Sequence, residues 1–412
     1  MHIPHFKTEG FKTWQRTLYI LFFAQLMVAV GFSSIFPFLP LYVEHLGSSS
    51  GLSIELLSGL VYSGQAFTMM LASPLWGALA DRHGRKLMVE RSMFGGALTL
   101  LLMSFAASAE QLVVMRTIQG LITGTIAAAN ALLASVTPRK HIGYAMGLLQ
   151  VGFGTGIAVG PLIGGFVADL FGYSVVFYLT AALLFLAGVL VHWGVHENFQ
   201  PKQSQQRKTS LLQDWRTLLG VAGVKVTFLT RFLTSMARMI VLPIIPLFIA
   251  TLLVDSSKLN TFTGLVMGIA SAATTISAVF LGKLGDRVGY RRVLIVSLVI
   301  MGVLYLPQGY ASAGWQLLVL QGLVGITLGG VLPIISALLA NYVKAGGEGA
   351  AFGLDNSINA AGRAVAPMIG AAIATGWGYP AVFVVTGLVC LAAVVLAALG
   401  LPPSRIKAET TG

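Results

Sequence analysis

Residues 77–86 read GALADRHGRK, and residues 282–291 read GKLGDRVGYR. Both stretches combine glycines with an aspartate that is followed directly by an arginine, and each lies in a short turn between two apolar segments. The shared residues stand in register, one set in each half of the chain: Asp81 with Asp286, Arg82 with Arg287, and Gly84 with Gly289. A single basic turn is common, but two matching copies indicate that the chain is built from two related halves.

The repeat extends along the chain at a constant spacing of 205–206 positions. FGYSVVFYLTA (171–181) matches WGYPAVFVVTG (377–387), and IFPFLPLY (35–42) matches VLPIIPLF (241–248). Chance similarity between apolar helices would not keep one spacing over separate segments. Parallel repeats of this kind are typical of secondary transporters, whose substrate site lies between the two halves near the membrane midplane.

The composition of the 412-residue chain is that of a membrane protein. Apolar residues make up 56% of it and charged residues only 10%, and the mean hydropathy is +0.83. Soluble proteins carry about 25% charged residues, so these charges cannot cover the surface of a water-soluble body. The formal net charge of +12 would suggest nucleic acid as the partner of a soluble protein. In a membrane protein the same charge reflects topology, and no nucleic acid is expected.

A helix needs roughly 20 apolar residues to cross a bilayer, and twelve segments have this length. They are expected near residues 17–46, 53–80, 87–107, 110–136, 141–168, 174–195, 222–253, 260–284, 291–309, 314–343, 349–376 and 380–401. The first segment is too long for a signal peptide and lacks a cleavage site, so we expect it to remain in the mature protein. The sequence predicts an all-α membrane protein with 12 transmembrane helices in two pseudo-symmetric six-helix bundles.

The positions of the cations predict the topology. Twenty-one of the 26 Lys and Arg fall in the tails or in loops on one side of the membrane, whereas Lys258 alone falls on the other side. Positive loops stay in the cytoplasm, so both termini are expected there, in a bacterial cytoplasmic (inner) membrane. The remaining four cations lie within spans: Arg116, Arg231, Arg238 and Arg363.

The predicted organisation has five parts. A cytoplasmic tail (1–16) precedes an N-terminal bundle (17–195), a cytoplasmic linker (196–221), a C-terminal bundle (222–401) and a second cytoplasmic tail (402–412). The linker is rich in Gln, Lys and Ser, which is typical of a flexible connection.

The two matching turns are candidates for a gate at the cytoplasmic side. Gly77 would allow close helix approach, and Gly84 would allow a turn with positive φ. Asp81 could cap a helix or pair with Arg82 or Arg85, forming a charged latch that breaks when the protein changes state. The alternative is an ordinary basic loop. The presence of two copies in register disfavours that alternative. The predicted gate residues are Gly77, Asp81, Arg82, Gly84, Arg85, Asp286, Arg287 and Gly289.

Polar residues recur on one face of the predicted fourth span. Arg116 is followed by Gln119, Thr123 and Asn130 at +3, +7 and +14 positions, which fits one side of a continuous helix. A guanidinium inside a span normally faces a cavity or a partner. The alternative is an arginine that extends toward the membrane surface. We favour the cavity.

Glycines recur every fourth position in the predicted fifth span, GTGIAVGPLIGG (154–165), as Gly156, Gly160 and Gly164, with Pro161 among them. This spacing forms a flat groove for a neighbouring backbone, and the proline removes one helical hydrogen bond. We interpret the stretch as a packing hinge. A phosphate-binding glycine loop is disfavoured, because the spacing is wrong and no strand precedes it.

Two polar stripes are expected in the second half, one in the seventh span and one in the eleventh. Each follows helical spacing and so lies along one helix face. The members are Arg231, Ser235 and Arg238 in the seventh span, and Asp355, Asn359 and Arg363 in the eleventh. Arg231 is the repeat counterpart of Gln25, so both halves place a polar group at the same depth.

Asp355 is the only carboxylate expected within a span. In dry surroundings it could carry a proton near neutral pH. We favour the alternative, in which Asp355 neutralises Arg363 or a cytoplasmic arginine.

Catalytic and nucleotide-binding motifs are missing from the sequence. It contains no HExxH, CxxC, GxSxG or GxxxxGK[ST] stretch, and its seven histidines have no ligand spacing. We expect neither an enzyme nor a metal site, and no cofactor. Uphill transport would have to draw its energy from an ion gradient.

These motifs resemble those of the major facilitator superfamily, over residues 15–402. GALADRHGRK and its second copy are similar to the loop signature of that family, and LVVMRTIQG (112–120) is similar to its fourth-helix arginine signature. GIAVGPLIGG resembles the fifth-helix signature of the antiporter branch, and HENFQP (196–201) differs from the PESPR-like stretch of sugar porters. The resemblance points to bacterial 12-helix drug/proton antiporters, the multidrug and tetracycline-type exporters.

The resemblance implies alternating access, with lipophilic or amphiphilic compounds exported against protons, and it implies that Arg116 assists proton transfer. Many relatives carry an acid in the first or fourth helix, whereas the first helix here offers Gln25. Asp355 and Arg116 are therefore the candidates for proton coupling. The expected partners are a small lipophilic or amphiphilic substrate, protons and the lipid bilayer, and the expected state is a monomer.

The cavity is expected between helices one, four, seven and ten, with helices five and eleven at its flanks. The candidate substrate-cavity residues are Gln25, Phe32, Phe36, Arg116, Gln119, Asn130, Arg231, Arg238, Asn359 and Arg363. A lipid or glycolipid flippase and a proton-coupled metabolite uptake symporter on the same fold are the alternatives. A transporter-like sensor that moves no solute is a further alternative. A membrane-embedded enzyme is disfavoured.

Overall fold

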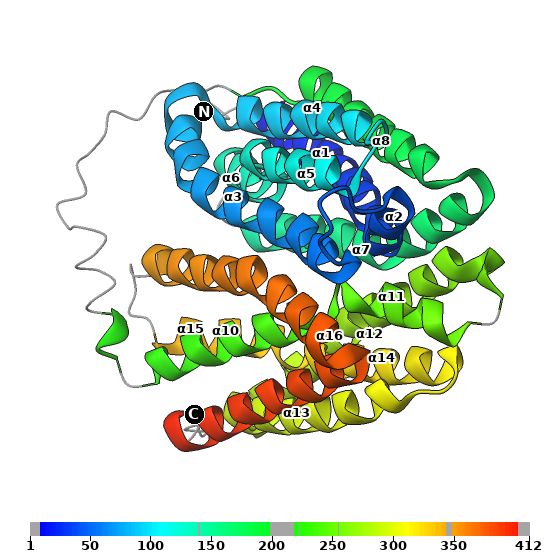
Figure 1. The fold of residues 1–412 in the computed structure, drawn as a ribbon. Helices are drawn as coiled ribbons and strands as arrows, with labels where there is room; N and C mark the ends of the chain where they lie inside the picture. Colours follow the sequence, from blue (N-terminus) through cyan, green and yellow to red (C-terminus); the bar gives the residue numbers. More distant parts are fainter. Residues whose placement is uncertain are drawn as a thin grey trace, which may run out of the picture.

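The computed structural model describes residues 9–138, 141–197, 218–221, 223–253, 255–342 and 348–402. The regular elements in these ranges are all helical (Figure 1). The first half contains α1 (Glu9–Ile35), α2 (Leu39–Leu46), α3 (Ile54–His83), α4 (Arg85–Met103), α5 (Ala109–Ile122), α6 (Thr125–Val136), α7 (Ile142–Phe171) and α8 (Tyr173–Gly194). The second half contains α10 (Val224–Val241), α11 (Ile244–Leu252), η2 (Ser256–Lys258), α12 (Leu259–Val288), α13 (Tyr290–Tyr305), η3 (Leu306–Tyr310), α14 (Gly314–Gly329), α15 (Leu332–Tyr342) and α16 (Glu348–Gly400).

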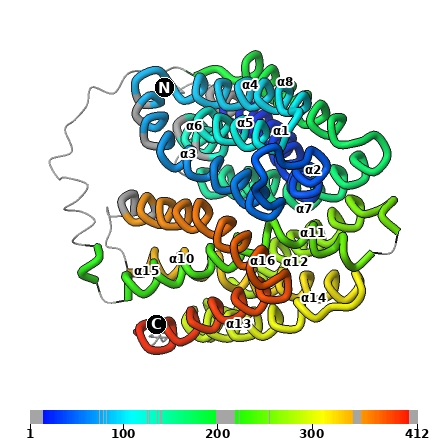
Figure 2. Tube along the Cα trace, viewed as in Figure 1, coloured from blue at the N-terminus to red at the C-terminus, as the bar shows by residue number. Residues whose placement is uncertain are grey.

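Each half has its own hydrophobic core, and Figure 2 shows the two halves as separate layers of helices. Buried residues between Trp14 and Val195 form the first core, and buried residues between Ala237 and Leu401 form the second. Phe36 and Leu242 are partly buried and pack against both cores. Each half is therefore stabilised by its own core, and the two halves pack against each other through α7 with α12 and α3 with α16.

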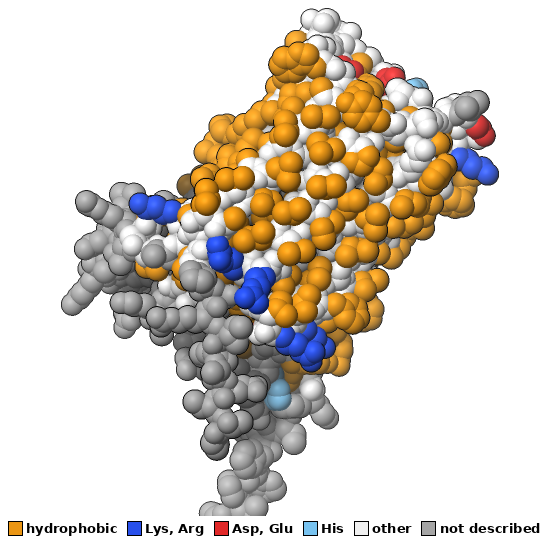
Figure 3. All heavy atoms as spheres, turned by 90° about the horizontal axis from the view of Figure 1, so that it is seen from below, with side chains coloured by type: hydrophobic (Ala, Val, Ile, Leu, Met, Phe, Trp, Pro, Cys, Tyr) orange, Lys and Arg blue, Asp and Glu red, His pale blue; other side chains and the backbone are white. Residues whose placement is uncertain are grey.

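The outer surface is suited to lipid. In the part of the chain that the structure describes, eight helical segments are long and apolar enough to cross a membrane. Many large apolar side chains face outward, and Figure 3 shows a broad apolar surface over the second half, with Lys and Arg gathered toward one end. We call this end, which carries residues 84–91 and 289–292, the basic end. The opposite end, where residues 47–53 and 172 connect helices, is the far end.

The two halves interrupt the same helices at matching positions. Residues 36–38 separate α1 from α2, and residues 242–243 separate α10 from α11. Gly124 separates α5 from α6, and Gly330 separates α14 from α15. These four helix pairs correspond to the predicted first, seventh, fourth and tenth spans. Discontinuous helices are the usual place of substrate sites in transporters with repeats, because the interruptions free backbone polar groups.

The turns at the two ends repeat in the same way. Gly84 (φ 98°) and Gly289 (φ 97°) join helices at the basic end, and Gly172 (φ 83°) and Gly378 (φ 80°) do so at the far end. A residue with a Cβ is strained at such φ values, so glycine is required there. The positive φ predicted for Gly84 is confirmed.

The structure adds detail to the predicted segments and corrects the fourth span. α1 begins at Glu9, within the segment expected to be a tail, because the polar residues continue the helix beyond its apolar part, which starts at Trp14. The fourth span is not one continuous helix, since Gly124 interrupts it. The last two predicted spans, 349–376 and 380–401, are two helices that share the label α16 and meet at the non-helical Gly378. Most of the linker (196–221) and of the second tail (402–412) lies outside the described residues.

Candidate functional site

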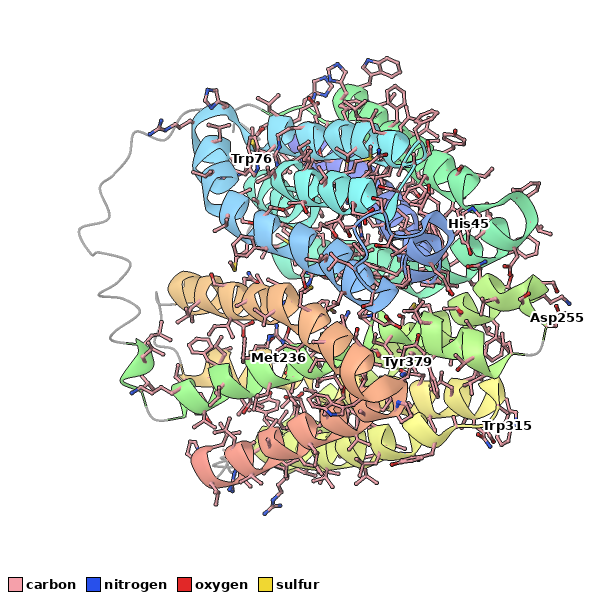
Figure 4. The ribbon with its side chains drawn as sticks, in the orientation of Figure 1. His45, Trp76, Met236, Asp255, Trp315 and Tyr379 are labelled. Carbon is pink, nitrogen blue, oxygen red and sulfur yellow. The ribbon has the colours of Figure 1, made fainter. Side chains whose placement is uncertain are left out.

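Three polar contacts join the two halves at the far end. The carboxylate of Asp169 accepts hydrogen bonds from the backbone N–H of Asn260 (3.1 Å), from its side-chain amide (2.8 Å), and from the backbone N–H of Thr261 (2.7 Å). These donors lie at the N-terminus of α12, which favours a negative group. The other two contacts join α3 to α16: Ser53 Oγ with Thr375 Oγ1 at 3.0 Å, and Tyr379 Oη with Glu55 Oε1 at 3.1 Å. Figure 4 labels Tyr379 where the halves meet.

Glycines bring the two halves into backbone contact on the same side. A Cβ on Gly59 of α3 would lie 2.8 Å from Ala371 Cβ and 2.9 Å from the carbonyl oxygen of Pro367 in α16. A Cβ on Gly264 of α12 would collide with the carbonyl of Pro161 in α7. The far end is therefore closed by α3 against α16 and by α7 against α12.

The same four helices are free of such contacts toward the basic end. No heavy atom lies within 4 Å of the position that a Cβ would take at Gly77 of α3, Gly147 of α7, Gly282 of α12 or Gly353 of α16. From the far end the contact between α7 and α12 extends to the middle of both helices, where a Cβ on Gly154 would lie 3.6 Å from Thr275 Cγ2. The described structure is closed at the far end and open at the basic end.

A ladder of polar pairs joins α10 to α16 inside the second half. Arg231 Nη2 lies 3.0 Å from Asp355 Oδ2, with only 12% and 4% of the two side chains exposed. One turn further along, Ser235 Oγ donates to Asn359 Oδ1 at 2.9 Å. Counting 1.5 Å per residue from Val224, Arg231 lies about 10 Å into the helix. Asp355 pairs with an arginine of the seventh span, Arg231, and not with Arg363 or a cytoplasmic arginine as expected.

The next rung of the ladder brings two like charges together. Arg238 and Arg363 stand about one turn beyond the Ser235–Asn359 pair on the facing helices α10 and α16, so their like charges repel each other. Arg238 is exposed although it stands about 21 Å along α10, which means that water reaches it inside the protein. In the described part of the chain neither Arg238 nor Arg363 has an ion pair or a hydrogen bond.

A second polar cluster lies inside the first half. Arg116 is 2% exposed, and its Nη1 donates to Gln119 Oε1 at 2.7 Å. Gln65 Nε2 donates to the same oxygen at 3.5 Å. Within the described residues Arg116 Nε, Gln119 Nε2 and both amide atoms of Gln25 have no partner. Arg116, Gln119 and Gln25 are thus buried polar groups with unused donors, sealed from solvent in this conformation.

Asn130 does not share a helix with Arg116, so the predicted single polar face is wrong. The helix stops at Ile122 and restarts at Thr125, because Gly124 adopts φ 150°. Trp76 Nε1 donates to the carbonyl of Leu121 in the last turn before the break, at 2.6 Å, and Arg91 lies over the Trp76 ring at 3.4 Å from its centre. Figure 4 labels Trp76 near this end of α3. Asn130 itself is half-buried in α6.

The two predicted aromatic residues occupy different places. Phe36 stands in the interruption between α1 and α2 and stacks on Tyr62, with ring centres 6.0 Å apart. Tyr62 in turn donates to the backbone oxygen of Phe36 at 3.1 Å. Phe32 packs against the core of the first half near Gly96. Phe36 therefore lies where the halves meet, whereas Phe32 belongs to one bundle.

The described side chains of the predicted gate turns form no charged latch in this conformation. Gly77 is not a close-contact glycine, because it faces open space at the basic end. Asp286 accepts a hydrogen bond from Tyr290 instead of pairing with Arg287. Among the described residues Arg82, Arg85 and Arg287 form no ion pair, and the side chain of Asp81 lies outside the described part.

The gate turn of the first half is instead held by residues at the end of the same half. Glu197, after α8, accepts hydrogen bonds from the backbone N–H groups of Arg85 (3.1 Å) and Lys86 (2.8 Å) and so caps the N-terminus of α4. Lys86 Nζ also donates to the carbonyl of His192 at 2.7 Å.

The glycine stripe of α7 packs as predicted. A Cβ on Gly156 would lie 2.9 Å from the carbonyl oxygen of Leu26, and Cβ atoms on Gly160 and Gly164 would collide with Ser33 and with the backbone of Ser34. The stripe thus receives the α1 backbone within the first half. The buried Pro161 lies in the same helix, and its role as a hinge stays a prediction.

Sequence reasoning missed several residues of these sites. Gln65 and Tyr62 lie in the second span, and a single Gln in an apolar stretch was the available signal for the first of them. Gln308 and Gln321 form a buried pair at 2.8 Å in the second half, and Gln321 is the repeat counterpart of Arg116. Asp169 was passed over because it stands at a helix end, where carboxylates are ordinary.

The described residues offer no metal site, since no three His, Cys, Asp or Glu side chains in those ranges come together. The buried Cys390 is a free thiol. The polar groups near the centre are amides, hydroxyls and guanidinium groups, which suit recognition of a solute by hydrogen bonds and charge.

Comparison with known proteins agrees with this architecture. The family model described as Major Facilitator Superfamily matches residues 21–252 and 227–412. Multidrug resistance protein MdtG of Salmonella dublin is 37% identical over 378 residues, covering 92% of this chain and 93% of that protein. MdtG of Serratia proteamaculans is 37% identical over 402 residues, covering 96% and 97%. The crystal structure of a D-xylose-proton symporter superposes with a TM-score of 0.80 at 14% identity, covering 96% and 99%. The chain is a multi-pass membrane protein that belongs to the major facilitator superfamily.

Proposed function

We propose that this protein is a multidrug exporter that moves lipophilic or amphiphilic compounds out of the cytoplasm in exchange for protons. The observation that carries the proposal is the difference between the two ends: the halves touch at the far end and are free of contact at the basic end. With the basic end in the cytoplasm, as the positive-inside rule favours, this conformation would take up solute from inside the cell. The name of the MdtG relatives supports the multidrug substrate range.

Transport would proceed by alternating access. The bundles 17–195 and 222–401 would rotate about the central contacts, so that the Asp169, Ser53 and Glu55 contacts break while the basic ends approach each other. The basic turns with Asp81 and Asp286 would form their charged contacts in that second state. The linker 196–221 and both termini would stay in the cytoplasm, and one chain would form the complete pathway.

The substrate would bind between the halves, beside the interrupted helices. Its site would draw on polar groups from both bundles and on Phe36, with Arg238 and Asn359 reached from the basic end. The buried cluster around Arg116 would join the site after a conformational change, because it is sealed in the present state.

Proton coupling would act through Asp355 and Arg231. Within the described residues this is the one ion pair between α10 and α16. A proton on Asp355 would remove the counter-charge of Arg231 and alter how tightly the two helices hold each other. Arg116, with its unused donors, would assist proton transfer within the first half.

The test is a flux assay in proteoliposomes with an amphiphilic dye and a pH-sensitive internal probe. We expect dye movement toward the acidic side to be accompanied by proton movement in the opposite direction, and a protonophore to stop dye accumulation. Accumulation that persists after the proton gradient is collapsed would overturn the antiport proposal.

A further inference from the structure

The central part of the second half carries more positive charge than its own residues neutralise. Three guanidinium groups, those of Arg231, Arg238 and Arg363, share the space between α10 and α16 with one carboxylate, Asp355. That carboxylate is engaged at 3.0 Å by Arg231. The excess charge therefore resides on Arg238 and Arg363, about two turns deeper than the ion pair.

These two arginines are held together against their mutual repulsion. They stand on facing helices that are locked by the Ser235–Asn359 hydrogen bonds one turn away, and Gly362 lets the backbone of α16 approach Ser235. Two cations brought close by rigid packing, without a counter-ion in the described residues, are stabilised when an anion binds between them. Arg238 is exposed, so a solute can reach it from the open basic end.

Two methionines flank Arg238 in the sequence of α10. Met236 and Met239 are partly buried on the same helix, and Figure 4 labels Met236 between α10 and the first part of α16. Methionine side chains adjust to ligands of different shape. In the first half the position that corresponds to Arg238 in the repeat is Phe32, so the excess charge belongs to one side of the pathway.

We propose that Arg238 and Arg363 form an anion subsite, which receives the carboxylate, sulfonate or phosphate group of an amphiphilic substrate while its apolar part lies against the methionines. This inference rests on the proposed export function and specifies its substrate class: amphiphiles with one negative group are bound in preference to neutral or cationic ones of the same shape.

The test uses binding of charge-matched probes to the purified full-length chain in nanodiscs. The probes share a dansyl group on an undecyl chain and differ in the terminal group, which is a carboxylate, a neutral amide or a primary ammonium. We expect the carboxylate probe to bind about tenfold or more tightly than the amide. Arg238→Gln and Arg363→Gln should remove this preference and leave amide binding within about twofold.

Two further variants separate the subsite from a general structural effect. Arg238→Lys, which keeps the charge, should retain part of the carboxylate preference, and Arg292→Gln, at an exposed arginine of the basic end, should leave it unchanged. Equal loss of all three probes in Arg238→Gln, or a wild-type protein without preference for the carboxylate, overturns the subsite. A wild-type preference without proton-coupled flux of any probe would instead refute the export function and leave the subsite standing.

Discussion

Asp169 of α7 caps the first turn of α12 in the opposite half, where it accepts both the backbone and the side-chain N–H groups of Asn260. Hydrogen bonds to a carboxylate are stronger than those between neutral groups. The repeat counterpart of Asp169 is Thr375, which makes only a hydroxyl contact with Ser53. The far end is thus closed unequally, and the α7–α12 side holds the stronger polar contact.

Asp169→Ala should shift the protein toward a state that is open at the far end. The substitution removes three hydrogen bonds to a charged group, and a loss of about 2–3 kcal/mol would change the equilibrium about 30-fold or more. The measurement is the distance between spin labels at Leu52 and Trp315, with Cys390 replaced by Ala. We expect the long-distance population to grow.

Asp255→Ala is the matched control for that experiment. Asp255 also lies at the far end and also accepts from a backbone N–H group, but its partner is Ser257 in its own half. The spin-label distances should stay those of the wild type. An unchanged distance distribution in Asp169→Ala would show that the glycine contacts alone close this end.

Gly264→Ala should block closure at the far end without preventing folding. The new Cβ would collide with the carbonyl of Pro161 in the other half, and backbone atoms cannot move aside as flexible side chains do. We expect transport to fall at least about tenfold, while thermal unfolding remains cooperative. Gly282→Ala, which meets no atom within 4 Å, is the control and should transport normally. Equal activity of both variants contradicts the prediction.

Asp355→Asn should uncouple transport from protons. The amide keeps the shape and a hydrogen-bond acceptor for Arg231 but cannot exchange a proton, so substrate counterflow should persist while the proton gradient no longer drives accumulation. Asp355→Ala should also destabilise the protein, by about 3 kcal/mol, because Arg231 loses its only ion-pair partner in the described residues. Flux assays and thermal unfolding of both variants test this. Full proton-driven accumulation by Asp355→Asn would assign a purely structural role to the carboxylate.

Gly84→Ala and Gly77→Ala should change stability in opposite directions. Gly84 has φ 98°, and a residue with a Cβ costs about 1–2 kcal/mol in this region. Gly77 lies in a regular helix with open space around it, where alanine is preferred by about 0.5–1 kcal/mol. Melting temperatures in detergent should fall for the first variant and rise or stay level for the second. A fall of equal size in both would mean that Gly77 has a packing role in another state.

Much of this architecture could be predicted from local sequence. Apolar length and the placement of Lys and Arg predict the spans, and the repeat predicts matching turns such as those at Gly84 and Gly289. The two polar stripes of the second half were also visible, because each follows helical spacing, but the pairing of Arg231 with Asp355 was not predicted.

The interruption at Gly124 could not be read in advance, since glycine also occurs inside membrane helices and only packing decides whether it breaks one. Asp169 shows the other limit. Its sequence position indicates a helix end, but the helix that it caps comes from residues 91 positions away. Contacts of this kind depend on how the two bundles pack against each other. The local sequence pattern carries no information on that packing.

The contrast between the two ends also determines from which side the protein can be inhibited. A ligand that reaches Arg238 and is too bulky to be enclosed would hold the halves apart at the basic end. The contacts between the halves at the far end would then stay formed. Such a blocker would have to be present on the side of the membrane from which the substrate enters, at the basic end. A compound confined to the other side would meet only the sealed face formed by Asp169, Gly264 and their partners, and it would gain entry only during the brief part of the cycle in which that face is open.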